Sequence, residues 1–224
     1  MSRARAALGR SAVGCYRLFV RARAKTFSTL SAGAFASFGR RSMLELPIRL
    51  VGEERIAVGD DVYVGAGSWL QTLEGPGYAG ELVVGDGTAI AGSCVLSAAV
   101  SVRVGRRVLF ARNVYVSDHI HAYEDRTRAV LDQGFDRLEP VVIGDGAWLG
   151  QNVVVCPGVT IGCGAVVGAN AVVCHNIPSN CHAVGIPARI LFPHGDDASP
   201  TGTWSAPASE RRPRELESAQ KHTA

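Results

Sequence analysis

Residues 141–173 read VVIGDGAWLGQNVVVCPGVTIGCGAVVGANAVV and repeat a six-residue pattern six times. Each repeat places an aliphatic residue, here called position i, two residues after a small or apolar residue. Side chains two residues apart lie on the same face of a β-strand. Each repeat therefore predicts a short strand with two inward side chains.

The same pattern extends toward the amino terminus and gives fifteen repeats in all. Position i is apolar in every repeat: Val58, Val64, Leu70, Val84, Ile90, Leu96, Val104, Phe110, Val116, Ile143, Leu149, Val155, Ile161, Val167 and Val173. Position i−2 is apolar or small in every repeat: Ile56, Val62, Ser68, Leu82, Thr88, Cys94, Val102, Val108, Val114, Val141, Ala147, Val153, Val159, Ala165 and Ala171. This register predicts one continuous core along the repeats.

The turn positions support the same architecture. Position i+1 is Gly, Ala, Ser or Cys in fourteen of the fifteen repeats, with Gln71 as the exception. Twelve repeats carry these residues at position i+3: Asp61, Gly67, Gly87, Ser93, Arg107, Asn113, Gly146, Asn152, Gly158, Gly164, Asn170 and Asn176. Ten of the twelve are Gly, Asn or Asp, which tolerate a left-handed backbone. A turn every six residues predicts triangular coils, five of them stacked as a parallel β-helix; another solenoid or an ordinary parallel sheet is the alternative.

The register breaks three times, each time after the third repeat of a coil. The next position i comes 14 residues after Leu70, 8 after Leu96 and 27 after Val116. The insertions should therefore leave from the same corner of the coil. Loops on a rigid scaffold often carry binding and catalysis, and the third insertion is too long to be a simple connector.

The long insertion, predicted as a protruding loop over residues 117–142, begins SDHIHAYED. It contains His119 and His121 beside Asp118, Tyr123 and Glu124. A neutral imidazole can accept a proton near neutral pH, and a nearby carboxylate can fix its tautomer. The residues therefore favour an acid–base site over a solvated loop.

Composition narrows the class of protein. The chain has 224 residues, 47% of them apolar and 19% charged, which suits one folded domain with extensions. No apolar run is long enough to predict a transmembrane helix. The six cysteines form no C-x-x-C pair, which argues against zinc and redox motifs and favours small packed thiols in a reducing cytoplasm.

The charge is unevenly distributed. Residues 1–44 hold nine cations and no acid, whereas the rest of the chain holds 14 cations and all 20 acids. A nucleic-acid binder needs a basic face on its folded domain, so we expect no nucleic-acid partner.

From Arg49 to Leu191 the chain resembles the hexapeptide-repeat acyltransferases, and within them the maltose, galactoside and nodulation O-acetyltransferases and the exopolysaccharide sugar acetyltransferases. Three motifs carry the resemblance: SDHIHAYED, the repeat run 141–173, and GIPARIL at residues 185–191. The resemblance implies a left-handed coil and transfer of an acetyl group from acetyl-CoA to a hydroxyl of a sugar or glycoconjugate. His119 aligns with the general base of these enzymes, and no metal is implied.

The resemblance also implies a homotrimer with the CoA site along the coil wall between subunits. The positions that match its cofactor contacts are Trp148, Gln151, Ala169, Cys174, His175 and Arg189. Gln151 is commonly Ser in relatives, and Cys174-His175 is often Thr-Lys. The loop residues Asp118, His121, Tyr123 and Glu124 are expected to contact the acceptor, either a small sugar or a lipid-linked glycan.

Three alternatives remain at this stage. A γ-class carbonic-anhydrase-like zinc enzyme would need three converging histidines, and only His119, His121 and His175 lie in or beside the coils. A non-catalytic scaffold would have lost the chemistry, and retention of His119 and GIPAR argues against it. N-acetylation of an amino sugar is the third.

The ends predict the domain organisation. Residues 1–48 should form a basic helical cap, 49–192 the β-helix domain, and 193–224 a disordered tail. Ala12, Tyr16, Phe19 and Val20 follow helical spacing, and a cap would protect the open end of the coil. A basic amphipathic helix also suits peripheral contact with the inner face of a membrane, and an acid-free Arg-rich segment resembles an organellar transit peptide.

Overall fold

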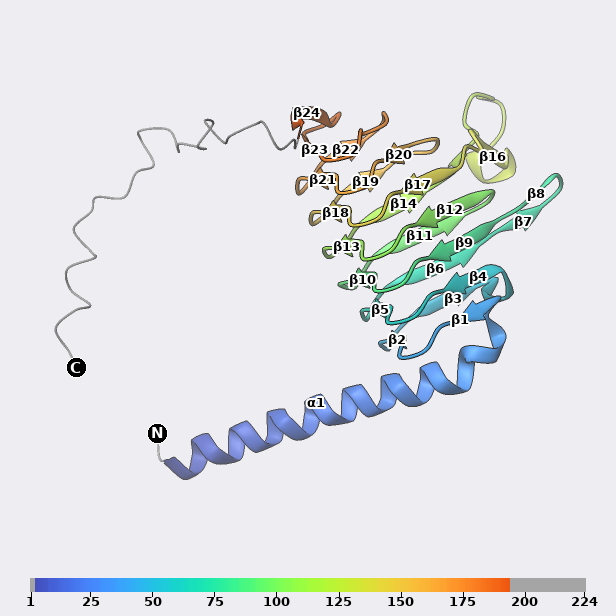
Figure 1. The fold of residues 1–224 in the computed structure, drawn as a ribbon. Coiled ribbons are helices and arrows are strands. Elements are labelled where there is room, and N and C mark those ends of the chain that lie inside the picture. Colours follow the sequence, from blue (N-terminus) through green and yellow to red (C-terminus); the bar gives the residue numbers. More distant parts are fainter. Residues whose placement is uncertain (1–2, 194–224) are drawn as a thin grey trace, which may run out of the picture. The chain divides into compact units, whose positions relative to one another are not determined.

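The structure is a computed structural model and describes residues 3–193. Apart from Pro193, the tail predicted to be disordered lies outside the described residues. The chain winds through three parallel sheets that form the walls of a triangular coil (Figure 1).

Each sheet stacks one strand from every coil, and sheet B also contains β23 and β24, which follow the last full coil. Sheet A contains β1 (Ser37–Phe38), β4 (Ile56–Val58), β9 (Glu81–Val84), β12 (Ser101–Val104), β17 (Val141–Ile143) and β20 (Thr160–Ile161). Sheet B contains β2 (Met43–Leu44), β5 (Tyr63–Val64), β10 (Ala89–Ile90), β13 (Leu109–Phe110), β18 (Trp148–Leu149), β21 (Val166–Val167), β23 (Cys181–Val184) and β24 (Arg189–Pro193). Sheet C contains β3 (Arg49–Val51), β6 (Trp69–Thr72), β11 (Val95–Ala98), β14 (Tyr115–Ser117), β19 (Val154–Val155) and β22 (Val172–Val173). The parallel pairing predicted from the repeat is confirmed, and β24 alone among these strands runs antiparallel, against β23.

The repeat places the core as predicted. All thirty residues at positions i and i−2 are at most 3% exposed. Eleven of the twelve i+3 turn residues have positive φ, and Asn176 is the exception. The small i+1 residues let coils approach closely, since a Cβ on Gly85 would lie 2.6 Å from the carbonyl carbon of Gly105.

The structure also contains a sixth coil that the repeat did not reveal. Strands β1, β2 and β3 pair in register with β4, β5 and β6, so coiling begins at Ser37, inside the segment predicted as the cap. Its corners depart from the pattern, because Glu45 and Val51 occupy position i+1 while Arg41 and Pro47 occupy position i+3.

Helix α1 (Arg3–Ser31) precedes the first coil and is followed by the 3-10 helix η1 (Ala32–Ala34). Its carboxyl-terminal part packs on that coil: Ala24 and Ser28 are buried, and Ser28 Oγ accepts a hydrogen bond from the Leu44 amide at 2.8 Å. Nothing in the described residues has the length and hydropathy of a bilayer-spanning helix.

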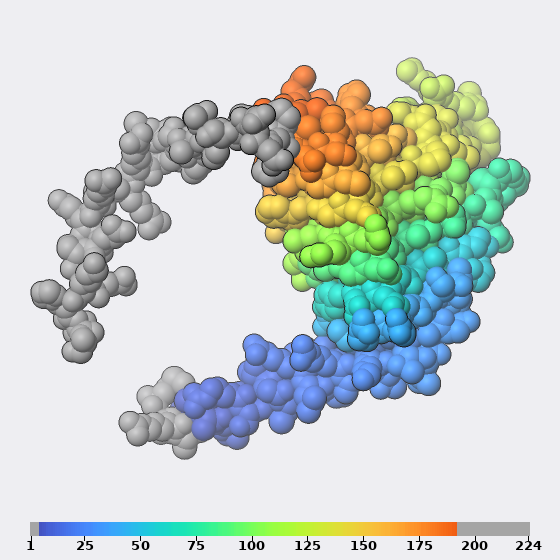
Figure 2. All heavy atoms as spheres, viewed as in Figure 1, coloured from blue at the N-terminus to red at the C-terminus, as the bar shows by residue number. Residues whose placement is uncertain are grey.

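The insertions leave from one corner, where sheet C passes to sheet A. The first forms a hairpin of β7 (Glu74–Gly75) and β8 (Tyr78–Ala79). The third contains β15 (Ile120–His121), the 3-10 helix η3 (Val130–Asp132) and β16 (Phe135–Asp136), and Figure 2 shows it standing out from the stacked coils. A further 3-10 helix, η2 (Glu53–Arg55), occupies the same corner in the first coil.

Candidate active site

A pocket of about 590 Å³ lies on the outer face of sheet C beside this corner. Its floor comes from β6, β11, β14 and β19, and its rim from the long loop. His119 and His121 both line the pocket, as do Cys156 and Pro157 of a later coil. The long loop therefore brings its two histidines to one cavity.

His119 is held by a carboxylate behind it. Its side chain is 8% exposed, and its Nδ1 lies 2.8 Å from Asp118 Oδ1. Ser117 Oγ lies 3.3 Å from the same nitrogen and donates a hydrogen bond to the His119 carbonyl at 2.8 Å. These contacts fix the orientation of the imidazole ring.

Asp118 is fully buried and saturated with donors. Its Oδ1 accepts from the Ala99 amide at 2.8 Å, and its Oδ2 accepts from the Val100 and Ser101 amides, each at 2.7 Å. Burial raises the pKa of this carboxyl, but the hydrogen bonds from His119 and from the three amides outweigh it, so the net pKa is lowered.

The charge on Asp118 sets the tautomer of His119. An ionised carboxylate can only accept hydrogen bonds, so the proton of a neutral His119 sits on Nδ1. The other ring nitrogen, Nε2, then carries a lone pair, which is the arrangement that a general base requires.

All three insertions meet at this histidine. The amides that hold Asp118 belong to the second insertion and its junction with β12. Phe135 of the third insertion packs on the rings of His119 and His121, with centroid distances of 4.5 Å and 4.9 Å. Tyr78 of the first insertion packs edge-on against Phe135 at 5.8 Å. Phe135, backed by Tyr78, thus forms a roof at the pocket, and the second insertion holds Asp118 behind His119.

The pocket floor combines polar and aromatic side chains. Gln71, Ser97 and Ser117 stack in register along sheet C, and Gln71 Nε2 donates to Ser97 Oγ at 2.5 Å. Trp69 and Tyr115 also line the floor, and the Arg49 guanidinium lies 3.9 Å from the Trp69 ring centroid. Such a surface can offer hydrogen bonds and flat apolar contact to one ligand.

The predicted acceptor contacts do not all reach this pocket. His121 lines it. Asp118 lies behind His119, so its burial does not fit the predicted contact with substrate, and we reassign it to orienting the imidazole. Tyr123 is 63% exposed and Glu124 is exposed, and neither is among the lining residues.

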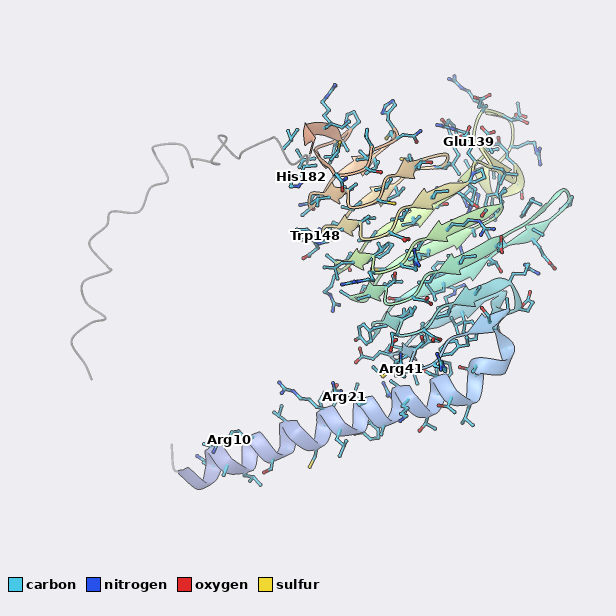
Figure 3. The ribbon with its side chains drawn as sticks, in the orientation of Figure 1. Arg10, Arg21, Arg41, Glu139, Trp148 and His182 are labelled. Carbon is cyan, nitrogen blue, oxygen red and sulfur yellow. The ribbon has the colours of Figure 1, made fainter. Side chains whose placement is uncertain are left out.

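The predicted CoA contacts fall into separate groups on one chain. Trp148 lies on the outer face of β18 in sheet B (Figure 3), whereas Gln151 and Ala169 lie in successive coils at the corner between sheets B and C. Cys174 and His175 are exposed where sheet C ends, and Arg189 begins β24.

Cys156 and Cys174 form a pair at the pocket margin, with their sulfur atoms 3.5 Å apart. Burial, together with the hydrogen bond that the Cys156 thiol shares with Cys174, raises the pKa of Cys156 to about 11. A thiol that holds its proton so tightly is a poor nucleophile at neutral pH. This agrees with a packing role for Cys156.

The zinc alternative gains no support from the described residues. Among them, no group of three or more His, Cys, Asp or Glu side chains is arranged to hold a metal ion.

Some residues of this site were missed by the sequence analysis. Phe135 and Tyr78 lie in two different insertions, so nothing in their spacing relates them to His119. A weak signal existed, since Phe135 is the only phenylalanine between the register break at 117 and the resumption at 143. The amides of residues 99–101 carry no side-chain signal at all.

Comparison with known proteins bears on the repeat and the fold. The family described as "Bacterial transferase hexapeptide (six repeats)" matches residues 140–175. A point mutant of AntD, an N-acyltransferase from Bacillus cereus in complex with dTDP and coenzyme A, superposes with a TM-score of 0.64 at 19% identity, over 75% of this chain and 89% of that chain. A hexapeptide-repeat acetyltransferase from Vibrio cholerae superposes with a TM-score of 0.51 at 27% identity, over 75% of this chain and 79% of that chain.

The chain therefore contains bacterial transferase hexapeptide repeats and has the fold of the hexapeptide-repeat acyltransferases, a left-handed parallel β-helix. The resemblance given by the sequence motifs is confirmed. AntD has also been captured with dTDP and 3-hydroxybutyryl-CoA, so this fold accommodates an acyl-CoA donor.

Proposed function

We propose that the protein transfers an acetyl group from acetyl-CoA to a hydroxyl of a sugar or glycoconjugate, with His119 as general base. The observation that carries the proposal is the buried Asp118–His119 pair, which fixes the imidazole at the edge of a pocket. The fold of acyl-CoA-dependent enzymes supports the donor, and the resemblance to sugar O-acetyltransferases supports the acceptor.

The geometry suits proton transfer through His119. Its Nε2 would take the proton of the acceptor hydroxyl as that oxygen attacks the thioester carbonyl. The ionised Asp118, held by three backbone amides, would stabilise the imidazolium that forms. The imidazolium would then return the proton to the departing thiolate, leaving an ester on the acceptor and a free thiol.

A second copy of the chain would complete the donor site. The candidate CoA residues lie on sheet B, at the corner between sheets B and C, and beyond the end of sheet C. A single chain therefore does not bring them together in one site. Sheet B carries an outward apolar row that includes Tyr63, Leu109 and Trp148. We propose that this face meets a neighbouring subunit in a cyclic homotrimer, which closes a head-to-tail interface.

The direct test is thiol release from acetyl-CoA across a panel of sugars, nucleotide sugars and lipid-linked glycans. We expect release that depends on one class of acceptor and yields a product one acetyl group heavier. Absence of transfer to every acceptor, with no acetyl-CoA binding in calorimetry, would favour the non-catalytic scaffold.

The same assay separates hydroxyl from amine acceptors. AntD is an N-acyltransferase, so matched pairs of hydroxyl and amino sugars should be compared. An ester product is cleaved by hydroxylamine at alkaline pH, whereas an amide survives. A hydroxylamine-resistant product would replace the O-acetyl proposal with N-acetyl transfer.

A further inference from the structure

Helix α1 presents two different faces. The face toward the first coil includes Ala24 and Ser28, which are buried, and Val20 and Phe27, which are half-buried. This face anchors the helix through the Ser28–Leu44 hydrogen bond. Among the helix residues that the structure describes, none on the opposite face is buried.

The outward face is apolar. At 3.6 residues per turn, it carries Leu8, Cys15, Leu18, Phe19 and Leu30. The four large side chains among them are between 60% and 81% exposed. Within an arc of about 120°, the remaining described positions are Ser, Thr or Ala, so no charge interrupts it.

Cations border this arc on both sides. Lys25 lies along one edge, next to Leu18, and Arg23 lies along the other, with its guanidinium 5.9 Å from the Phe19 ring centroid. Arg23 also donates a hydrogen bond to the Leu46 carbonyl of the first coil at 2.7 Å. Arg10 and Arg21, labelled in Figure 3, lie further round the helix, and Arg21 lines the groove between α1 and the first coil. No acid occurs before Glu45, so the helix is uniformly positive.

We infer that the outward face of α1 binds an anionic lipid surface, with Leu8, Leu18 and Phe19 entering the headgroup boundary. An apolar arc with cations along its edges is the pattern of helices that lie in a membrane interface. The bordering cations attract anionic headgroups, and each contributes independently to binding. A second copy of the same face would bring like charges together, so charge complementarity favours lipid over self-association.

Binding of this kind is reversible, since it depends on a shallow apolar face and on screened charges. It does not depend on the proposed acetyl transfer. If both hold, an acceptor carried on a lipid would meet the enzyme at its own surface.

The experiment is co-sedimentation of the full chain with vesicles. Vesicles of phosphatidylcholine mixed equally with phosphatidylglycerol should bind the protein at low salt and release it at high salt. Vesicles of phosphatidylcholine alone should bind it far more weakly. Failure to bind the anionic vesicles at low salt would overturn the inference.

Two matched substitutions locate the contact on the helix. Phe19→Asp should lower the vesicle partition coefficient by roughly tenfold or more, because it removes an inserted ring. Val13→Asp is the control, since Val13 is half exposed but lies on the same side of the helix as Ala24. Helix content by circular dichroism should match between the two variants. Equal loss of binding in both would overturn the assignment of the face.

A second pair tests the charges. Lys25→Gln should weaken binding roughly fivefold at low salt. Arg107→Gln removes the same charge from the coils and should have little effect. If the wild-type protein does not bind vesicles and Phe19→Asp lowers the oligomer mass in light scattering, the face is an interface between copies. The lipid inference is then wrong.

Discussion

Asp145 and Asp118 lie at two different corners of the β-helix. Backbone amides of the preceding coil hold both carboxylates, but the two residues have different roles. Asp145, at the corner between sheets A and B, accepts a hydrogen bond from the Arg106 amide at 2.8 Å and pairs with the Arg106 guanidinium at 2.9 Å. Asp118, at the corner between sheets C and A, also accepts from the backbone of the preceding coil and pairs with His119. Both have lowered pKa values because these bonds favour the carboxylate, which for Asp118 overcomes burial.

The two pairs differ in their exposure to solvent. The side chains of Asp145 and Arg106 are 45% and 69% exposed, so water and salt screen their attraction. Asp118 and His119 are 0% and 8% exposed, and Phe135 packs on the His119 ring. One coil geometry thus provides a stacking contact at a bare corner and a polarised imidazole at a covered one.

Removal of the base should have the largest effect. We expect His119→Ala to fold normally and to lose about 10²–10⁴-fold in kcat, since the acceptor proton then has no recipient. His121→Ala should lose less, because His121 lines the pocket without an Asp118 contact. Steady-state transfer assays at saturating acceptor measure both. Near-normal activity of His119→Ala would show that the covered corner is not catalytic.

The next largest effect is expected from changing the residue that orients His119. Asp118→Asn must place an amide where both oxygens now accept hydrogen bonds, so one donor faces another. We expect kcat to fall about 10²-fold, because an Asn oxygen turned toward the Val100 and Ser101 amides leaves its NH2 group facing Nδ1 of His119. That contact favours the tautomer with the proton on Nε2, which then has no lone pair for the acceptor proton. Unfolding free energy should fall by about 1–3 kcal/mol from the unpaired buried donors. Full activity in this variant would separate Asp118 from the chemistry.

The same carboxylate gives a pH signature. Its pKa is lowered in the folded state, so its stabilising effect is present above the ordinary Asp pKa and is lost as pH falls through the folded value. Wild type should therefore lose stability on acidification below about pH 4, while Asp118→Asn shows a shallower slope there. Urea denaturation at several pH values measures this difference, and parallel slopes would contradict it.

A smaller effect is expected at the roof. Phe135→Ala removes the ring that contacts both imidazoles, and we expect kcat/KM to fall about tenfold through looser positioning of His119. Leu131→Ala is the matched control, since Leu131 lies in the same loop and is 86% exposed. Equal effects of the two substitutions would mean that the whole loop, rather than the Phe135 contact, matters.

The fold could be predicted from the sequence because every coil requires the same residue types at the same positions. Position i, position i−2 and the left-handed turn recur every six residues, so one atypical residue does not obscure the pattern that the neighbouring repeats show. The sixth coil could not be predicted because Glu45 and Val51 occupy turn positions where the other repeats have small residues. Only the pairing of β2 and β3 with the next coil identifies it.

The candidate site was predictable in part. His119 could be picked out because it lies where the longest break begins. The role of Asp118 could not, because its burial depends on amides of residues 99–101, which belong to another coil. Contacts between insertions, such as Tyr78 with Phe135, arise only when separate coils stack.

The smallest effect is expected at the bare corner. Asp145→Asn retains an Oδ1 that can accept from the Arg106 amide, so only the charge of the pair is lost. We expect no change in transfer activity and a decrease in the urea midpoint that is smaller than that of Asp118→Asn and disappears at high salt. Midpoints of both variants at low and high salt provide the comparison. A salt-independent loss as large as that of Asp118→Asn would mean that exposure does not separate the two corners, and that the shared anchoring to the preceding coil governs both.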